Sequence, residues 1–316
     1  MAQTLDALLD QLRESAAMPP HAALYLFSTL DAKAAARVRE AWTDWPVELR
    51  RRLVARLVEL AEADFEANFD AVFRLCLKDE DGDVRATAIV GLWEDQDVRL
   101  IPLLTVLLRE DEVAAVREAA ATSLGRFILL GELGKLHPDP FTTTYDALLA
   151  ACLDAKECLD VQRRALESLA YVGNETVRDM IREAYGSPEE KVRVSAVFAM
   201  GRSADDCWAR QVQQELGSPN PELRYEAARA CGELQLNDTV PELEELADGA
   251  DPDIQEAALW ALGQIGGERA QEILEHYCNV KDEALQAAAE AALDELMFMH
   301  GDLSDLIAKA GKEPGW

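Results

Sequence analysis

An apolar pattern recurs along this chain every 31 residues, and it limits the possible folds more than any other feature. Each copy has an alanine four residues after its first apolar residue and a larger packing residue after eight. The regular copies open at Val161, Val192, Leu223, Ile254 and Leu285, and two earlier copies open at Val84 and Val116. Offsets of 0, 4 and 8 lie on one face of an α-helix. A fixed period of this length is typical of a solenoid, in which stacked repeats share one continuous core.

Each copy carries the signals for two helices. The longer helix follows an N-cap residue, and in two copies a proline takes its first position. These N-cap residues are Asp81, Asn220, Asp251 and Asp282. Glycines such as Gly266 and Gly267 end the longer helix, and a shorter apolar-periodic segment follows, as at 240–246. We therefore expect an all-α chain built from helix pairs.

The phrases Asp83-Val84-Arg85 and Lys191-Val192-Arg193, with Ala-Leu-Gly later in the helix, resemble the HEAT-like repeat. The subtype they resemble is the short form first noted in phycobilisome lyases. The resemblance covers residues 79–296 and implies an α-solenoid, a superhelix of stacked antiparallel helix pairs. It also implies that the helix with the Val-Arg phrase is the second of each pair and lines the concave side. Glutamine replaces the usual arginine in three copies, which predicts an interrupted charge ladder at Gln162, Gln255 and Gln286.

The extent of the pattern predicts three regions. Residues 1–63 are helical but do not follow the pattern, and we expect a divergent N-terminal cap over the exposed end of the core. Residues 64–300 form the repeat array, and residues 301–316 a C-terminal capping helix and tail. The first region is predicted to contain four helices, near 3–16, 20–30, 31–43 and 46–63, with breaks at Pro19-Pro20 and Trp45-Pro46.

The repeat register breaks once, because 45 residues separate Val116 from Val161 where 31 would be expected. The excess falls at about 131–144, a segment that contains several glycines, prolines and threonines. Such a composition predicts an irregular loop between repeats. Insertions in solenoids tend to project from one side, so the loop is either a functional element or a tolerated insertion.

The charge balance restricts the partners. Lys and Arg number 31 against 60 Asp and Glu, a net charge of -29. Binding to nucleic acid or to an anionic membrane needs clustered cations, so neither is expected. The acidity either keeps a long exposed surface soluble or attracts a basic protein or peptide. The first ten residues do not resemble a signal peptide, and the six cysteines form no Cys-x-x-Cys pair, so we expect a cytoplasmic protein.

No set of residues in the sequence predicts catalysis. The four histidines lie far apart, and there is no Gly-rich phosphate loop and no Gly-x-Ser-x-Gly turn. A family built on this scaffold, resembling deoxyhypusine hydroxylase, binds two irons through repeated His-Glu pairs, and this chain contains no such pair. We therefore expect a protein that is not an enzyme and has no cofactor or metal site. Cys231, at offset 8, is expected to be a small buried hydrophobe.

A stripe of aromatic residues and arginines predicts a binding surface. Offsets 2, 6 and 10 of each copy are turned away from the core, and large aromatic residues or arginines recur there between residues 163 and 264. Tyrosine, tryptophan and arginine are the residues that most often anchor interfaces. The candidate partner-binding residues are Arg163, Tyr171, Phe198, Arg202, Tyr225, Arg229 and Trp260. They predict a scaffold that binds a protein or peptide, unless Phe198 and Trp260 turn inward and fill gaps between layers.

Two other functions are compatible with the sequence. In a role resembling that of the phycobilin lyases, Arg163, Arg202 and Arg229 would pair with tetrapyrrole propionates. In a self-assembling protein, the basic cluster Arg50–Arg52 with Arg56 would meet the acidic side of a second copy. The same cluster also fits a solvated helix face.

The arginine that follows the first apolar residue of a copy has a structural interpretation. It is close enough to pair with an acidic residue of the next layer. The residues at this position are Arg85, Arg117, Arg193 and Arg224.

Overall fold

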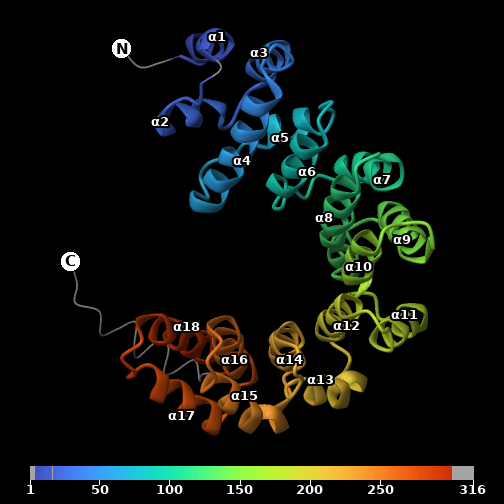
Figure 1. Ribbon diagram of the computed structural model, residues 1–316, viewed down its shortest axis with the longest axis vertical. Helices are drawn as coiled ribbons and strands as arrows, with labels where there is room; N and C mark the ends of the chain where they lie inside the picture. Colours follow the sequence, from blue (N-terminus) through green and yellow to red (C-terminus); the bar gives the residue numbers. More distant parts are fainter. Residues whose placement is uncertain (1–3, 16, 301–316) are drawn as a thin grey trace. The chain divides into compact units, whose positions relative to one another are not determined.

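The computed structural model describes residues 4–15 and 17–300, and all regular secondary structure in that part is helical (Figure 1). The chain divides into two compact units, unit 1 (Met1–Ser168) and unit 2 (Leu169–Trp316). None of the described helices is long and apolar enough to cross a membrane. The expected C-terminal helix and tail, residues 301–316, lie outside the described residues.

Unit 1 begins with the four helical segments expected near the N-terminus, the second of which is a short helix continued by a 3-10 turn. Its later helices are paired, and α4, α6 and α8 pack against one another in sequence. The helices are α1 (Leu5–Ser15), α2 (His21–Leu24), η1 (Tyr25–Phe27), α3 (Ala32–Trp42), α4 (Val47–Ala63), α5 (Asp70–Cys76), α6 (Gly82–Gly91), α7 (Leu100–Glu110), α8 (Ala114–Glu132), α9 (Pro138–Leu153) and α10 (Leu159–Leu169), which ends at the unit boundary.

Unit 2 consists of two helix layers (Figure 1). The second helices of the pairs, α12, α14, α16 and α18, pack side by side, and the first helices cover them from one side. The predicted order within each pair is therefore confirmed. The helices are α11 (Glu175–Tyr185), α12 (Glu190–Arg202), η2 (Asp206–Trp208), α13 (Ala209–Glu215), α14 (Pro221–Glu233), η3 (Asn237–Thr239), α15 (Val240–Ala247), α16 (Pro252–Ile265), α17 (Glu268–Tyr277) and α18 (Glu283–His300).

The repeating positions form the core of unit 2, as the period predicts. The alanines at offset 4 and the larger residues at offset 8 are fully buried in α12, α14 and α16: Ala196, Met200, Ala227, Cys231, Ala258 and Leu262. Burial raises the pKa of the Cys231 thiol to about 12, which fits the expected small buried hydrophobe. Val192 is half-buried, whereas its counterparts Leu223 and Ile254 are buried.

The predicted N-caps are confirmed. The four cap side chains accept hydrogen bonds from backbone amides two or three residues later, which satisfies donors that have no partner within the helix. These side chains are Asp81, Asn220, Asp251 and Asp282.

Two of the arginines that follow the first apolar residue pair with the next layer, as expected. Arg85 forms a two-point contact with Asp111, at 2.8 and 2.7 Å, and both side chains are nearly buried. Arg117 forms the same contact with Glu157, at 2.8 and 2.7 Å. Such forked pairs fix the orientation of both groups, and they link neighbouring helix pairs of unit 1.

The arginines at the same position in unit 2 share a backbone contact with those of unit 1. Like Arg85 and Arg117, Arg193 and Arg224 donate to backbone carbonyls six residues earlier, in the turn before their helix, at 3.1 and 2.8 Å. Gln162 and Gln255 donate to carbonyls eight residues earlier, at 2.7 and 2.8 Å. Gln162 and Gln255 therefore replace the charged arginine, as predicted, but keep a contact with the backbone, whereas Gln286 donates to the Glu290 carboxylate at 2.8 Å.

The Arg117–Glu157 pair predicts how stability depends on pH. Hydrogen bonds from Arg117 and from the Cys158 amide lower the pKa of Glu157 below its unfolded value of about 4.3. The pair therefore stabilises the fold fully above that value, and its contribution is lost as the pH falls through the lowered pKa. We expect Glu157→Gln to reduce the free energy of unfolding by about 1 kcal/mol at neutral pH and by nothing in acid.

The measurement for this prediction is chemical denaturation, followed by circular dichroism, from about pH 7 to about pH 3. Glu62→Gln is the matched control, because Glu62 is exposed on α4. A difference between wild type and Glu157→Gln that persists at the acid end would show that the pair does not act through its charge.

The expected loop at 131–144 is not irregular. α8 continues to Glu132 and α9 begins at Pro138, so five residues separate two helices. Proline is tolerated in the first turn of a helix, because the amides there have no intrahelical partner. Thr144 then donates from its hydroxyl to a backbone carbonyl one turn earlier, at 2.8 Å. The additional residues lengthen helices, and the prolines mark the start of one.

The basic cluster of α4 is divided: Arg52 and Arg56 are exposed, as on a solvated face, whereas Arg50 and Arg51 pair with other residues of unit 1. Arg50 is 3% exposed and contacts Asp79 at 2.6 Å, in the turn before the next repeat helix. Arg51 contacts Asp81 at 2.9 and 2.6 Å. Both expectations were wrong for these two arginines, because their partners follow about 30 residues later and are not visible as neighbours in the sequence.

Candidate binding surface

The aromatic residues of the predicted stripe lie on three neighbouring second helices of unit 2. Phe198 lies on α12, Tyr225 on α14 and Trp260 on α16. Tyr225 is 36% exposed, while Phe198 and Trp260 are partly exposed and neither is buried. Neither Phe198 nor Trp260 is therefore fully buried between the layers.

Four of the predicted residues come together around one hollow. It has a volume of about 180 Å³ and lies where α12 faces α14. Its lining consists of Phe198, Arg202, Tyr225, Glu226, Arg229, Ala230 and Glu233.

Each arginine of the hollow stacks on an aromatic ring. The Arg202 guanidinium lies 5.2 Å from the centre of the Phe198 ring, and the Arg229 guanidinium lies 3.8 Å from that of Trp260. Such contacts contribute about 0.5–2 kcal/mol each and hold the flexible arginine in place. The planar guanidinium groups of Arg202 and Arg229 are therefore held in position before any partner binds.

Glu233 is one of two glutamates that line the hollow. Burial raises the pKa of Glu233, and the nearby Arg202 and Arg229 oppose that rise. Its carboxylate lies 3.3 Å from Arg202. There is room for it because a Cβ on Gly201 would lie only 2.7 Å from the Glu233 Oε2 atom. The sequence pattern contained Glu233 at offset 10 of the same stripe, but its role in pairing was not predicted.

Two predicted residues do not line this hollow. Arg163 lies on α10 in unit 1, where its side chain is 11% exposed and contacts Asp160 at 2.9 Å. Tyr171 lies just after α10 and is half-buried. The residues that the structure brings together are those of α12, α14 and α16.

A larger hollow lies on unit 1, where the sequence predicted none. It has a volume of about 540 Å³ and lies between α6 and α8. The earlier copies lack aromatic residues at the stripe offsets, but Trp93 enters from the turn after α6, because that helix ends at Gly91. The sequence pattern did not show that this helix ends at Gly91, so it did not predict that Trp93 lies at this surface. The lining residues are Ala86, Thr87, Ile89, Val90, Trp93, Ala115, Glu118, Ala119, Thr122, Ser123 and Arg126.

Within the described residues, no group of three or more His, Cys, Asp or Glu side chains is arranged to hold a metal ion. The four histidines of the sequence also lie on separate elements: His21 on α2, His137 before α9, His276 on α17 and His300 at the end of α18.

A family model of HEAT repeats matches residues 70–137 and 209–294. No curated protein sequence matches the chain significantly. Among solved structures, the CpcE–CpcF complex of phycocyanin lyase from a Nostoc species is 19% identical over 72% of this chain and 94% of that one, with a TM-score of 0.48. Human deoxyhypusine hydroxylase is 20% identical over 93% and 96%, with a TM-score of 0.31. A designed armadillo repeat protein in complex with a (KR)4 peptide is 18% identical over 62% and 99%, with a TM-score of 0.37.

Proposed function

For this chain, which carries HEAT repeats in both of its units, we propose a non-catalytic scaffold that binds a protein or peptide on the second-helix layer of unit 2. One observation supports the proposal above the others. Phe198, Tyr225 and Trp260 come from three consecutive repeats and remain partly exposed on one layer. Aromatic residues that the fold does not bury are the usual anchors of an interface.

The size of the hollow favours a side chain of a partner over a cofactor. Sites for small molecules usually enclose about 300–1,000 Å³, and the hollow on unit 2 has about 180 Å³. A single large side chain of a bound segment fits such a space. Binding would order few groups of the scaffold, because Arg202 and Arg229 are already held by aromatic rings.

The net charge of the chain favours a basic segment. At the hollow itself, Arg202 and Arg229 offset the charges of Glu226 and Glu233, while Glu256 is exposed on α16. The face of the Tyr225 ring also attracts cations. With a net charge of -29, the whole chain would speed the approach of a basic partner, so binding should weaken as the salt concentration rises.

The experiment is selection of displayed random peptides on the full chain, followed by affinity measurement on Phe198→Ala/Tyr225→Ala/Trp260→Ala. We expect the selected peptides to be basic and to bind this variant about a hundredfold more weakly. The charge-neutral control is Gln213→Ala/Gln214→Ala/Gln271→Ala, on helices α13 and α17 of the other layer, and it should bind like wild type.

Circular dichroism must first show that both triple variants keep the helicity of the wild type. Peptides that bind the aromatic variant as tightly as the wild type would contradict the proposal. So would a selection that yields no binder better on wild type than on that variant.

A further inference from the structure

The hollow on unit 1 has the size and the walls of a small-molecule site. Its volume of about 540 Å³ lies within the usual range of about 300–1,000 Å³. Ile89 and Val90 of α6 and the alanines of α8 form an apolar wall. Trp93 is 47% exposed beside it, so its ring is available for contact with a bound molecule.

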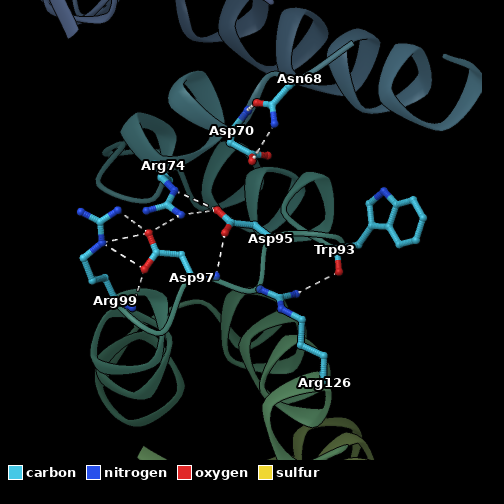
Figure 2. A network of polar contacts seen from close by, with 8 residues as sticks. All are labelled: Asn68, Asp70, Arg74, Trp93, Asp95, Asp97, Arg99 and Arg126. Atoms are coloured by element: carbon cyan, nitrogen blue, oxygen red, sulfur yellow. Dashed lines mark hydrogen bonds and ion pairs between the residues drawn. The ribbon is translucent and has the colours of Figure 1, made fainter. Parts of the chain in front are cut away.

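Two residues of α8 that line this hollow have buried polar atoms without a hydrogen-bond partner among the described residues. Ser123 is 9% exposed, and its hydroxyl has no hydrogen-bond partner within the described residues. Arg126, three residues later on the same face of the helix, also lines the hollow. Its Nε and Nη2 atoms have no partner in the described part of the chain, and its Nη1 atom reaches the Trp93 carbonyl only at 3.5 Å (Figure 2).

The neighbouring carboxylates are committed to other arginines. Figure 2 shows Asp95 turned to Arg74, which donates to it at 2.9 Å, and Asp97 held between Arg74 and Arg99. Burial lowers the pKa of Arg126 to about 10, and Asp95 counteracts this only in part. The Arg126 guanidinium lies 4.8 Å from the centre of the Phe127 ring, which compensates part of the desolvation. Most of its hydrogen-bonding capacity is still unused, which is costly unless an anion completes it.

We propose that this hollow binds a small organic monocarboxylate with an apolar body. The carboxylate accepts hydrogen bonds from the Arg126 guanidinium and the Ser123 hydroxyl, and the body packs against Val90 and the Trp93 ring. Arginine matches a carboxylate because its parallel N–H groups can contact both oxygens.

The local charge favours one carboxylate over a phosphate or a dicarboxylate. Glu118 is in the lining of the hollow, and Asp70 and Asp95 act on Arg126 electrostatically. These carboxylates would repel a second negative charge on the ligand. The site is separate from the peptide-binding surface proposed on unit 2, so either proposal can fail without the other.

The test measures binding of octanoate and of 1-octanol to the full chain by titration calorimetry. The two probes share an apolar body and differ in the charged head. We expect wild type to bind octanoate about ten- to a hundredfold more tightly than 1-octanol, and Arg126→Gln to abolish this preference. Ser123→Ala should reduce it in part, and Arg109→Gln, at an exposed site on α7, should leave it unchanged.

A filling substitution tests the place of binding. Ala119→Phe should exclude both probes, because Ala119 lines the hollow. Arg126→Gln should keep the thermal stability of the wild type, since it removes a desolvated charge, and any lost affinity then reports on binding.

Three results would overturn the proposal. One is equal affinity of wild type for octanoate and 1-octanol, or no binding of octanoate at millimolar concentration. Another is unchanged octanoate binding by Arg126→Gln or Ala119→Phe. The third is tighter binding of a peptide that ends in leucine with a free carboxylate than of octanoate, which would assign the site to a chain terminus.

Discussion

Replacement of Arg50 by methionine is expected to reduce the free energy of unfolding of unit 1 by about 3–5 kcal/mol. The reason is the buried carboxylate that the substitution leaves behind. The Asp79 side chain has no exposed surface, and Arg50 contacts it at 2.6 Å. Removing one partner of a buried ion pair leaves the full desolvation penalty of the other, whereas an exposed pair contributes about 0–1 kcal/mol.

Asp79 is the centre of a small network. Besides Arg50, it accepts a hydrogen bond from the Trp42 indole at 2.5 Å and from the Asp81 amide at 2.9 Å. These bonds connect α3, α4 and the turn before α6, so three elements of unit 1 depend on one carboxylate. Loss of the ion pair should therefore destabilise all three elements.

A second substitution separates the charge from the packing. Asp79→Asn removes the charge and keeps one acceptor oxygen, for either the Trp42 indole or the Asp81 amide, so adding it to Arg50→Met should restore about 1 kcal/mol. Arg52→Met, on the same helix at an exposed position, should change stability by less than about 0.5 kcal/mol.

Thermal and chemical unfolding, with hydrogen exchange of the α3, α4 and α6 amides, would measure these differences. A loss of less than about 1 kcal/mol for Arg50→Met would refute the description of this pair as buried and essential.

The architecture was predictable from the sequence because it depends on local and repeating signals. The 31-residue spacing puts Ala196, Ala227 and Ala258 at equivalent core positions, and all three are fully buried. Side-chain caps such as Asp251 mark helix starts through contacts within three residues. Signals of this range can be interpreted without knowing which segments meet in space.

The features that the sequence did not predict depend on contacts between residues far apart in the sequence, or on where a helix begins or ends. Arg50 was interpreted as a surface charge because its partner is 29 residues away. Pro138 was interpreted as part of a loop because proline is common both in loops and at the first position of a helix. Trp93 did not fit the stripe because its helix ends two residues before it.

The candidate surface on unit 2 was predicted in outline from the same periodicity. Offsets along the helix put Phe198, Tyr225 and Trp260 on one layer, but they could not show which side chains meet. Arg202 contacts Glu233, which lies on the next second helix. Contacts between repeats depend on how closely the helices approach each other. That distance depends on glycines, which have no side chain.

Gly232 controls that approach between α14 and α16. A Cβ at this position would lie 2.8 Å from the Ala261 Cα atom and 2.8 Å from the Cζ3 atom of Trp260. An alanine inside a helix is ordinarily more stable than glycine by about 1 kcal/mol. Here the backbone of α16 occupies the space that a Cβ atom would need, so glycine should be more stable than alanine at position 232.

We expect Gly232→Leu to lower the free energy of unfolding of unit 2 by about 3 kcal/mol, because the added side chain forces α14 and α16 apart. Gly173→Ala is the control without a clash, since nothing lies within 4 Å of its Cβ position. Hydrogen exchange of the α14 and α16 amides, together with thermal unfolding, would measure both changes. A thermal stability of Gly232→Leu equal to that of wild type would mean that the two helices are not held in close contact.

The same substitution should remove the aromatic group from the candidate surface. Because the Trp260 ring lies over Gly232, a leucine there displaces the ring and breaks its stacking with Arg229. Gly263→Ala separates the two effects: its Cβ would lie 2.6 Å from the Ala292 carbonyl oxygen, and the three atoms nearest to it all belong to Ala292. We expect Gly263→Ala to lose stability but to bind selected peptides at a temperature where it is folded, and Gly232→Leu to lose both. If Gly232→Leu binds as well as Gly263→Ala, the position of Trp260 does not contribute to binding. Loss of binding by Gly232→Leu alone would show that the glycine that allows close helix packing also positions the proposed anchor.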